Sequence, residues 1–171
     1  MDYTPLFEPA DLKKIQLRNR LVMAPMTTIS GEENGSFSEQ EIRYLAQRAE
    51  DGIGMIMTPA CYCHKSGHAF ERQVGCHSDA MLDGLSHCAE AINRHGAASI
   101  LQIHHGGNAS KSEYTRSTVL APSPVKNRRG TSEVPNGMTE DEINMIIDSF
   151  AQAARRAKIA GFTGIELHGA N

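Results

Sequence analysis

The sequence predicts an α/β fold, the first half of a (β/α)8 TIM barrel with only strands 1 to 4 present. Three observations favour this class. An amphipathic helix, a glycine and an apolar strand follow one another three times, and a further apolar strand precedes the first helix. The strands are nearly continuous apolar runs, which is typical of parallel strands buried on both faces. Polar residues stand where the strands end, the position of functional residues in barrels.

The first strand is expected within RLVMAPM, residues 20–26. The helix that follows is expected to begin at Ser38, because Glu41 stands three residues further on and completes a capping box. Apolar residues then recur at helical spacing, and the glycine at position 52 ends the helix. The second strand, GIGMIMTPA, covers residues 52–60.

The second and third repeats have the same order. The second helix is expected to start after Ser78 or Asp79, and the third strand is AASILQIHH, residues 97–105. The third helix opens with TEDE, a capping box at Thr139, and the fourth strand is FTGIELH, residues 162–168. Each helix is expected to end at a glycine, which tolerates the left-handed conformation of a helix C-terminus. These glycines are Gly52, Gly96 and Gly161.

Two segments lie outside the repeat. Residues 1–19 are predicted to form a short hairpin or N-terminal cap that leads into the first strand. Residues 106–138 form a long excursion after strand 3, rich in Gly, Ser, Pro and charged residues, which could act as a lid. A doubly wound sheet is the alternative architecture, but the chain has neither the GxGxxG nor the GxxxxGK[ST] phosphate loop. A barrel typically needs about 250 residues, so this pattern amounts to about half of one.

Length and composition indicate one soluble globular domain, with 171 residues, 40% hydrophobic and 22% charged. The net charge of -3 argues against a nucleic-acid partner. No apolar stretch reaches the ~18 residues of a membrane helix, and the start of the chain lacks the apolar core of a signal peptide. A cytoplasmic protein is therefore expected, with its cysteines present as thiols. They are Cys61, Cys63, Cys76 and Cys88.

The strand ends carry the residues best suited to chemistry. These are Pro25, Met26 and Thr27 after the first strand, Ala60 after the second, Gln102, His104 and His105 in the third, and His168 in the fourth, followed by Asn171. Because His104 and His105 are adjacent on a strand, at most one of them faces the barrel mouth. A metal site at CYCHKSGH is not expected, because the spacing is not that of a CxxC zinc site.

Four segments resemble the old yellow enzyme family of FMN-dependent NAD(P)H oxidoreductases, which includes ene-reductases and 2,4-dienoyl-CoA reductases. They are LFEPADLKKIQLRNRLVMAPM (6–26), ILQIHHGGN (100–108), LAPSPV (120–125) and AARRAKIAGFTGIELHGAN (153–171). The likeness runs through essentially the whole chain in the right order. Its NR-xxx-APM and GF-xx-IE-x-HGAN segments are specific when they occur together.

The resemblance implies a barrel with FMN across its mouth, NAD(P)H as reductant and a small-molecule substrate. It implies roles at the matching positions, with Ala24, Pro25, Met26, Thr27, Ala60 and Gln102 as flavin contacts, and His168 and Asn171 as the pair that binds the substrate's carbonyl oxygen. Hydride transfer belongs to the cofactor, and the protein positions it. Two donors that polarise the carbonyl of an activated alkene, an enone or a dienoyl thioester, make its β-carbon a better hydride acceptor.

In the family, the tyrosine proton donor, the phosphate site and the iron–sulfur cysteines follow the region matched here. The resemblance therefore implies that residues 1–171 are the N-terminal half of a single FMN-binding domain, and a longer parent protein is expected. The alternative function is a truncated half-barrel without a competent flavin site, acting as a homo-oligomer or an interaction fragment, because open sheet edges invite association. A metal-dependent barrel hydrolase ranks last, because strand 1 carries no His-x-His and the carboxylates are not clustered.

Overall fold

The computed structural model describes residues 1–128 and 133–170. The strands of the main sheet are β3 (Val22–Met23), β4 (Met55–Met57), β5 (Cys61–Tyr62), β6 (Ala98–His104) and β9 (Gly164–Leu167). The three long helices are α1 (Glu39–Glu50), α2 (Leu82–Asn93) and α4 (Glu140–Ala160). Strands and helices alternate along the chain, so the predicted α/β fold and its half-barrel order are confirmed.

The main sheet is parallel, with β6 at its centre. β3 pairs with β4, β4 and β5 both pair with β6, and β9 pairs with the other side of β6. β4 and β5 are thus two parts of one barrel strand, interrupted at residues 58–60. Thr58 bridges the interruption, because its N–H donates to the Ile100 carbonyl at 2.9 Å and its Oγ1 accepts from Gln102 N at 3.1 Å.

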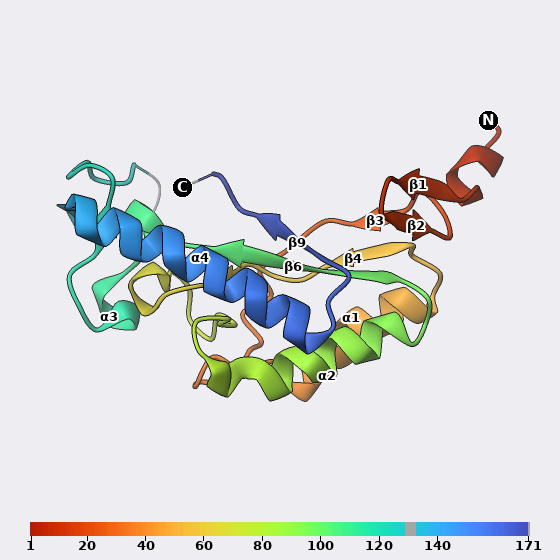
Figure 1. Ribbon diagram of the computed structural model, residues 1–171, viewed down its shortest axis with the longest axis horizontal. Coiled ribbons are helices and arrows are strands. Elements are labelled where there is room, and N and C mark those ends of the chain that lie inside the picture. Colours follow the sequence, from red (N-terminus) through yellow and green to blue (C-terminus); the bar gives the residue numbers. More distant parts are fainter. Residues whose placement is uncertain (129–132, 171) are drawn as a thin grey trace.

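The two faces of the sheet have different partners. The outward residues Ile56, Leu101 and Ile103 are fully buried in one core with the apolar faces of α1, α2 and α4. The inward residues Met55, Ala98 and Ile100 pack instead around Leu17. In Figure 1 the helices line one side of the sheet and leave its other side to the barrel interior.

A hairpin covers the end of the sheet at which the parallel strands begin. It consists of β1 (Ala10–Leu12) and β2 (Ile15–Leu17), paired antiparallel. Ile15 and Leu17 lie against the first residues of the parallel strands, in the core around Met55 and Ala98. Figure 1 shows the hairpin at one end of the sheet and α3 (Ser112–Thr115) at the opposite end, where the strands finish.

The described residues of the excursion after β6 form little regular structure. They contain α3, a short 3-10 turn at Gly107–Ala109, and the two-residue strands β7 (Leu120–Ala121) and β8 (Asn136–Gly137). Three further 3-10 turns lie at Thr4–Phe7, Lys65–Gly67 and Asp79–Met81. The last of these precedes α2, so the α-helix proper begins at Leu82, two or three residues beyond the start predicted after Ser78 or Asp79.

The two predicted capping boxes had different outcomes. At α4 both halves are present, since Thr139 accepts from Glu142 N and the Glu142 carboxylate accepts from Thr139 N at 2.8 Å. At α1, Ser38 accepts from Glu41 N at 3.1 Å, but the Glu41 carboxylate accepts from the hydroxyls of Thr28 and Ser30 instead. The capping box predicted at Ser38 is therefore wrong in its second contact, the one from the Glu41 carboxylate back to the Ser38 backbone. Glu41 holds the loop that follows β3 instead of its own helix N-terminus.

Burial on both faces holds for β6 and for most of β4 and β5, but not for β3 and β9 at the two edges. All seven residues of β6 are buried. At the edges, Val22 of β3 is 47% exposed and Leu167 of β9 is 63% exposed. The expectation was wrong for these two strands because each pairs with a neighbour on one side only.

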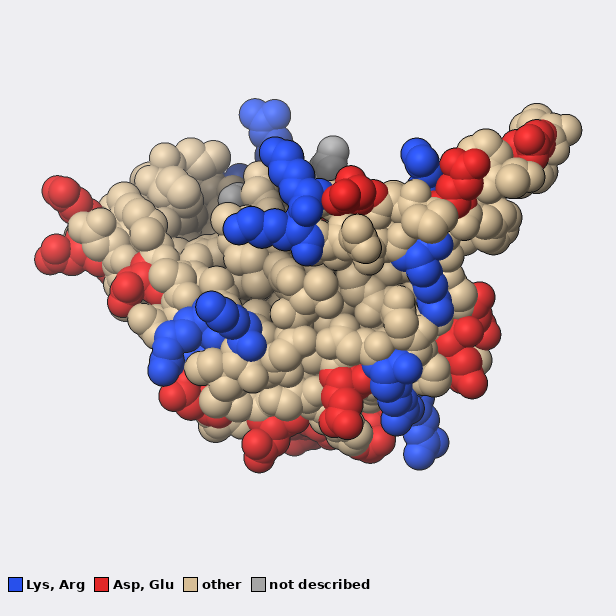
Figure 2. Space-filling model, turned by 45° about the vertical axis from the view of Figure 1, so that its right-hand side comes forward, with Lys and Arg blue, Asp and Glu red and all other residues tan. Residues whose placement is uncertain are grey.

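All four cysteines are free thiols, as expected, and all four are buried. No helix within residues 1–128 and 133–170 is long and apolar enough to cross a membrane. On the face shown in Figure 2, basic and acidic side chains are interspersed around a largely uncharged centre.

Candidate active site

A cavity of about 340 Å³ opens at the C-terminal ends of the parallel strands. Its lining residues come from every strand of the half-barrel: Pro25, Thr27, Ala60, Phe70, Gln102, His104, His168 and Ala170. Five of the eight candidate residues are among them, namely Pro25, Thr27, Ala60, Gln102 and His168. The structure therefore brings together side chains that lie up to 143 positions apart, from 25 to 168, at one opening.

Three candidate residues are not among the cavity's lining. Ala24 and Met26 lie in the same segment as Pro25 and Thr27, but successive side chains of an extended chain point to opposite sides. Met26 is accordingly 54% exposed. Asn171 lies outside the described residues.

Gln102 is fixed by its position on β6. Its side chain shares the inward face with Ala98, Ile100 and His104, since strand residues alternate. It is 5% exposed, and its Nε2 donates to Glu166 Oε1 at 2.6 Å. The sequence analysis did not predict Glu166 at this site. Its position could have indicated it, because a residue two positions before His168 lies on the same face of the strand as His168.

His168 follows β9 and lies at the rim of the cavity. Its backbone N–H donates to the Ile103 carbonyl at 3.0 Å, which extends the β6–β9 pairing by one residue. Its Nδ1 accepts from Ala170 N at 3.5 Å. Its ring meets the His104 ring edge to face, with the centroids 4.6 Å apart and the planes at 83°.

His104 is the histidine of the adjacent pair that faces the cavity. It is 1% exposed, and its Nδ1 lies 3.1 Å from Gln73 Nε2. Burial, with smaller contributions from the neighbouring rings of His168 and His105, lowers the pKa of His104 to about 3. The side chain is therefore uncharged at neutral pH.

His105 faces away from the cavity. Its Nε2 lies 3.0 Å from Ser66 Oγ, and its Nδ1 accepts from Gly107 N at 3.1 Å. Burial, with a contribution from His64, lowers its pKa to about 4. The sequence-based expectation that at most one of the two histidines faces the mouth is thus met, with His105 in a structural role.

A larger cavity, about 730 Å³, lies outside the mouth among the loops after the first three barrel strands. Tyr62 forms part of its wall, stacked between His68 at 4.6 Å and His77 at 4.8 Å. Its charged lining residues are balanced in sign: Lys65, Arg72 and Arg116 against Glu33, Glu71 and Glu113. The smaller cavity at the strand ends remains the candidate active site, because the side chains that converge there are the ones suited to chemistry.

The structure has the features of half of a barrel enzyme. Strands and helices alternate, and a cavity with a mostly uncharged polar lining lies at the strand ends. Comparison with known proteins identifies the family. The chain belongs to the NADH:flavin oxidoreductase / NADH oxidase family, whose model matches residues 5–171.

Relatives and solved structures agree with this assignment. The chain is 39% identical to a probable NADH-dependent flavin oxidoreductase, YqiG, of Bacillus subtilis, over 99% of this chain and 45% of that protein. It is 37% identical to an NADH:acrylate oxidoreductase of Vibrio harveyi, over 92% of this chain and 16% of that protein. The structure superimposes on morphinone reductase in complex with tetrahydroNAD with a TM-score of 0.90 at 28% identity, over 97% of this chain and 49% of the other.

An old yellow enzyme homologue from Zymomonas mobilis gives a TM-score of 0.87 at 27% identity, over 95% of this chain and 48% of that one. The chain thus spans about half the length of these solved structures, and less than half of the two curated relatives. It folds as half of an old-yellow-enzyme barrel.

Proposed function

We propose that the protein containing this chain is an FMN-dependent NAD(P)H oxidoreductase that reduces activated alkenes, either enones or dienoyl thioesters. Residues 1–171 would be the N-terminal half of a single FMN-binding barrel domain, with 1–19 as its cap and 106–138 as an excursion beside the mouth. One observation carries the proposal: Thr27, Ala60, Gln102 and His168, from four different strands, line one cavity.

The lining fits a flat, uncharged ring system. The hydrogen-bonding side chains are an amide, a hydroxyl and imidazoles, and His104 is kept neutral by burial. The one nearby carboxylate, Glu166, already accepts from Gln102. Ala60 has a one-carbon side chain, which leaves room for a ring to approach β4. FMN, when bound, supplies the hydride transfer, and the chain supplies position and polarity.

Each residue would have a distinct task. Pro25 and Thr27 would hold the ring edge at the end of β3. The Gln102 amide, oriented by Glu166, would hydrogen-bond the pyrimidine part of the ring. His168, together with Asn171, would donate to the carbonyl oxygen of the acceptor. The Nδ1 contact with Ala170 N favours the tautomer with its hydrogen on Nε2, which leaves that nitrogen as the donor.

Two donors aimed at one carbonyl oxygen would stabilise negative charge that develops there during reduction. The cavity walls strengthen that effect, because buried aromatic and imidazole rings lower the local dielectric. The names of the relatives support an alkene conjugated to a carbonyl, since acrylate and fumarate both have this chemistry.

The buried free thiols support a cytoplasmic location. Burial raises the pKa of Cys61 and of Cys63 to about 12, so both remain protonated. Such thiols suit a reducing compartment.

The test is the colour of the purified protein. We expect flavin absorbance in a stoichiometric amount, bleached under anaerobic conditions by NADH or NADPH and restored by an enone or by a dienoyl thioester. Colourless protein that takes up no FMN on reconstitution would contradict the proposal.

A further inference from the structure

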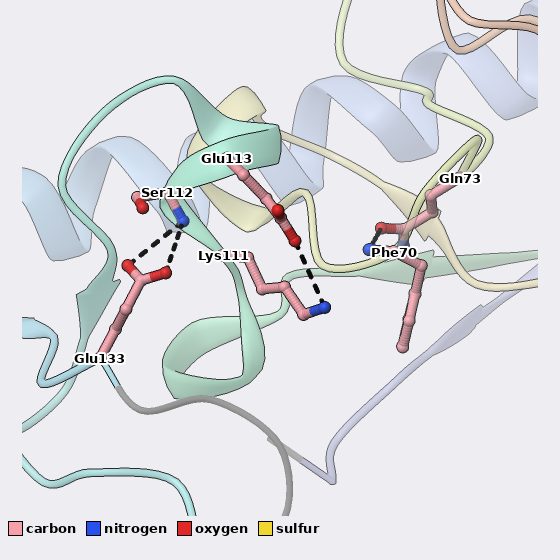
Figure 3. A network of polar contacts seen from close by, with 6 residues as sticks. All are labelled: Phe70, Gln73, Lys111, Ser112, Glu113 and Glu133. Carbon is pink, nitrogen blue, oxygen red and sulfur yellow. Dashed lines mark hydrogen bonds and ion pairs between the residues drawn. The ribbon is translucent and has the colours of Figure 1, made fainter.

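Gln73 lies under the mouth of the candidate active site and uses all of its polar atoms. It is 3% exposed and belongs to the loop between β5 and α2. Its Oε1 accepts from Ala69 N at 2.9 Å and from Phe70 N at 3.3 Å. Figure 3 shows the carboxamide against the Phe70 backbone, apart from the Lys111–Glu113 and Ser112–Glu133 contacts of the excursion.

The oxygen and nitrogen of this amide are assigned by their partners. Two backbone N–H groups point at one atom, so that atom must be the oxygen. The other atom is then Nε2, a donor, which lies 2.9 Å from the Ala60 carbonyl and 3.1 Å from His104 Nδ1. A nitrogen that receives a hydrogen bond carries no hydrogen, so the hydrogen of the neutral His104 ring lies on Nε2.

Gln73 thereby connects three walls of the cavity. Ala60, Phe70 and His104 all line it, and each hydrogen-bonds the same amide through its backbone or its ring. The Phe70 ring stacks on His104 with the centroids 6.0 Å apart. His104 in turn meets His168 edge to face at 4.6 Å.

We infer that Gln73 is a positioning residue that fixes the tautomer and ring plane of His104 and, through that ring, the orientation of His168 toward the substrate carbonyl. The role of His168 in this inference rests on the proposed function. The tautomer and ring plane of His104 do not depend on it. A neutral His104 with its Nδ1 engaged presents a ring of defined orientation to His168, whereas a rotated or charged ring would displace it.

The decisive measurement uses the unmodified protein. With ¹⁵N-labelled histidine, the ring nitrogens report directly which one carries the hydrogen, and the His104 signal is assigned by its loss in His104→Asn. We expect His104 to be neutral at pH 7, with hydrogen on Nε2. Hydrogen on Nδ1, or a charged ring at pH 7, would overturn the inference.

Gln73→Glu tests the link to His168. A carboxylate still accepts from Ala69 and Phe70, but it cannot donate to His104 Nδ1. We expect the His104 hydrogen to move to Nδ1 and the His168 ring signals to shift, while the exposed Gln152→Glu leaves both unchanged. Unchanged His104 and His168 signals in a folded Gln73→Glu protein would refute the link. The unmodified protein still decides the first half if this variant does not fold.

In the flavin-loaded enzyme, Gln73→Glu should affect the binding of the enone but not the reduction of the flavin by NADH. We expect KM for an enone to rise by ~10-fold or more, because a misplaced donor weakens carbonyl binding, with little change in the rate at which NADH bleaches the flavin. Equal effects on both steps would contradict a positioning role. If the unmodified protein binds no flavin, the proposed function is wrong. The histidine spectra would still show whether Gln73 fixes the tautomer of His104.

Discussion

At the scale of single residues, the pair Gln102 and Glu166 is the most consequential contact at the mouth. The amide of Gln102 donates to Glu166 Oε1 at 2.6 Å, and its own backbone N–H is held by Thr58. The side chain therefore has one orientation before any ligand arrives. A preoriented amide binds a ring without losing further side-chain freedom.

Gln102→Leu should weaken FMN binding. The variant removes one hydrogen bond to the ring and leaves the Glu166 carboxylate without its partner, a loss of about 1–3 kcal/mol. The dissociation constant, measured by flavin fluorescence, should rise ~10- to 100-fold. Gln152→Leu, at an exposed position of α4, is the control. Equal affinities for the two variants would place the flavin elsewhere.

His104 makes stability depend on pH. Its pKa in the folded state, about 3, lies below the ordinary value of 6.5. The unfolded chain therefore binds the proton more readily, so stability falls as pH drops from 6.5 toward 3 and is unaffected above that range. His105 and His77, each with a pKa lowered to about 4, act in the same direction.

We expect the free energy of unfolding to decrease between about pH 7 and pH 5, with His104 contributing about 2 kcal/mol. Urea titrations at the two pH values measure it. In His104→Phe the decrease should be smaller by that amount. An identical pH dependence with and without His104 would show that this ring is not held neutral.

At the scale of elements, the sequence predicted the strands and helices well because each repeat carries several signals that agree. The Thr139 capping box, the apolar stripe and Gly161 all mark α4. The α1 box failed in its second half because a buried carboxylate took hydroxyl partners from a distant loop. Local spacing does not reveal such tertiary competition.

The site was predictable only where residues lie on strands. Alternation along β6 and the ends of the other strands predicted that Gln102 and His168 lie at the mouth, where both line the cavity, but left open whether His104 or His105 faces it. Phe70 and Gln73 were missed, because a loop without periodicity gives no indication of which side chains turn inward. Of residues 24–27, which were all expected to contact the flavin, Pro25 and Thr27 line the cavity, and the flavin contact of the segment stays a prediction.

The helix end at Gly161 gives a prediction for α4. This glycine has φ of +88° with nothing within 4 Å of an added Cβ, so a substitution meets backbone strain alone. Gly161→Ala should lower the free energy of unfolding by about 1–2 kcal/mol. Gly169→Ala, which also has open space and lacks the positive φ, should change it by less than about 0.5 kcal/mol. Equal effects would contradict the left-handed cap.

At the scale of the whole molecule, the half-barrel has two open edges. Val22, Ile165 and Leu167 on the edge strands are 47%, 41% and 63% exposed. Unpaired edges with apolar side chains favour association. Prepared alone, residues 1–171 should therefore elute from a sizing column as a dimer or larger species.

A matched pair of variants tests which surface is responsible. Leu167→Glu should shift the elution toward the monomer, whereas Val125→Glu, at a similarly exposed site in the excursion, should not. A monomeric unmodified chain would contradict the expectation that the edges drive association.

Side chains from four strands share one mouth, and we propose that this mouth receives a flavin. The most direct test adds FMN to the protein labelled with ¹⁵N-histidine and follows the ring signals. We expect the signals of His104 and His168 to shift on binding, while those of the distant, partly exposed His87 and His95 do not. Bound FMN that leaves His104 and His168 unmoved would contradict it.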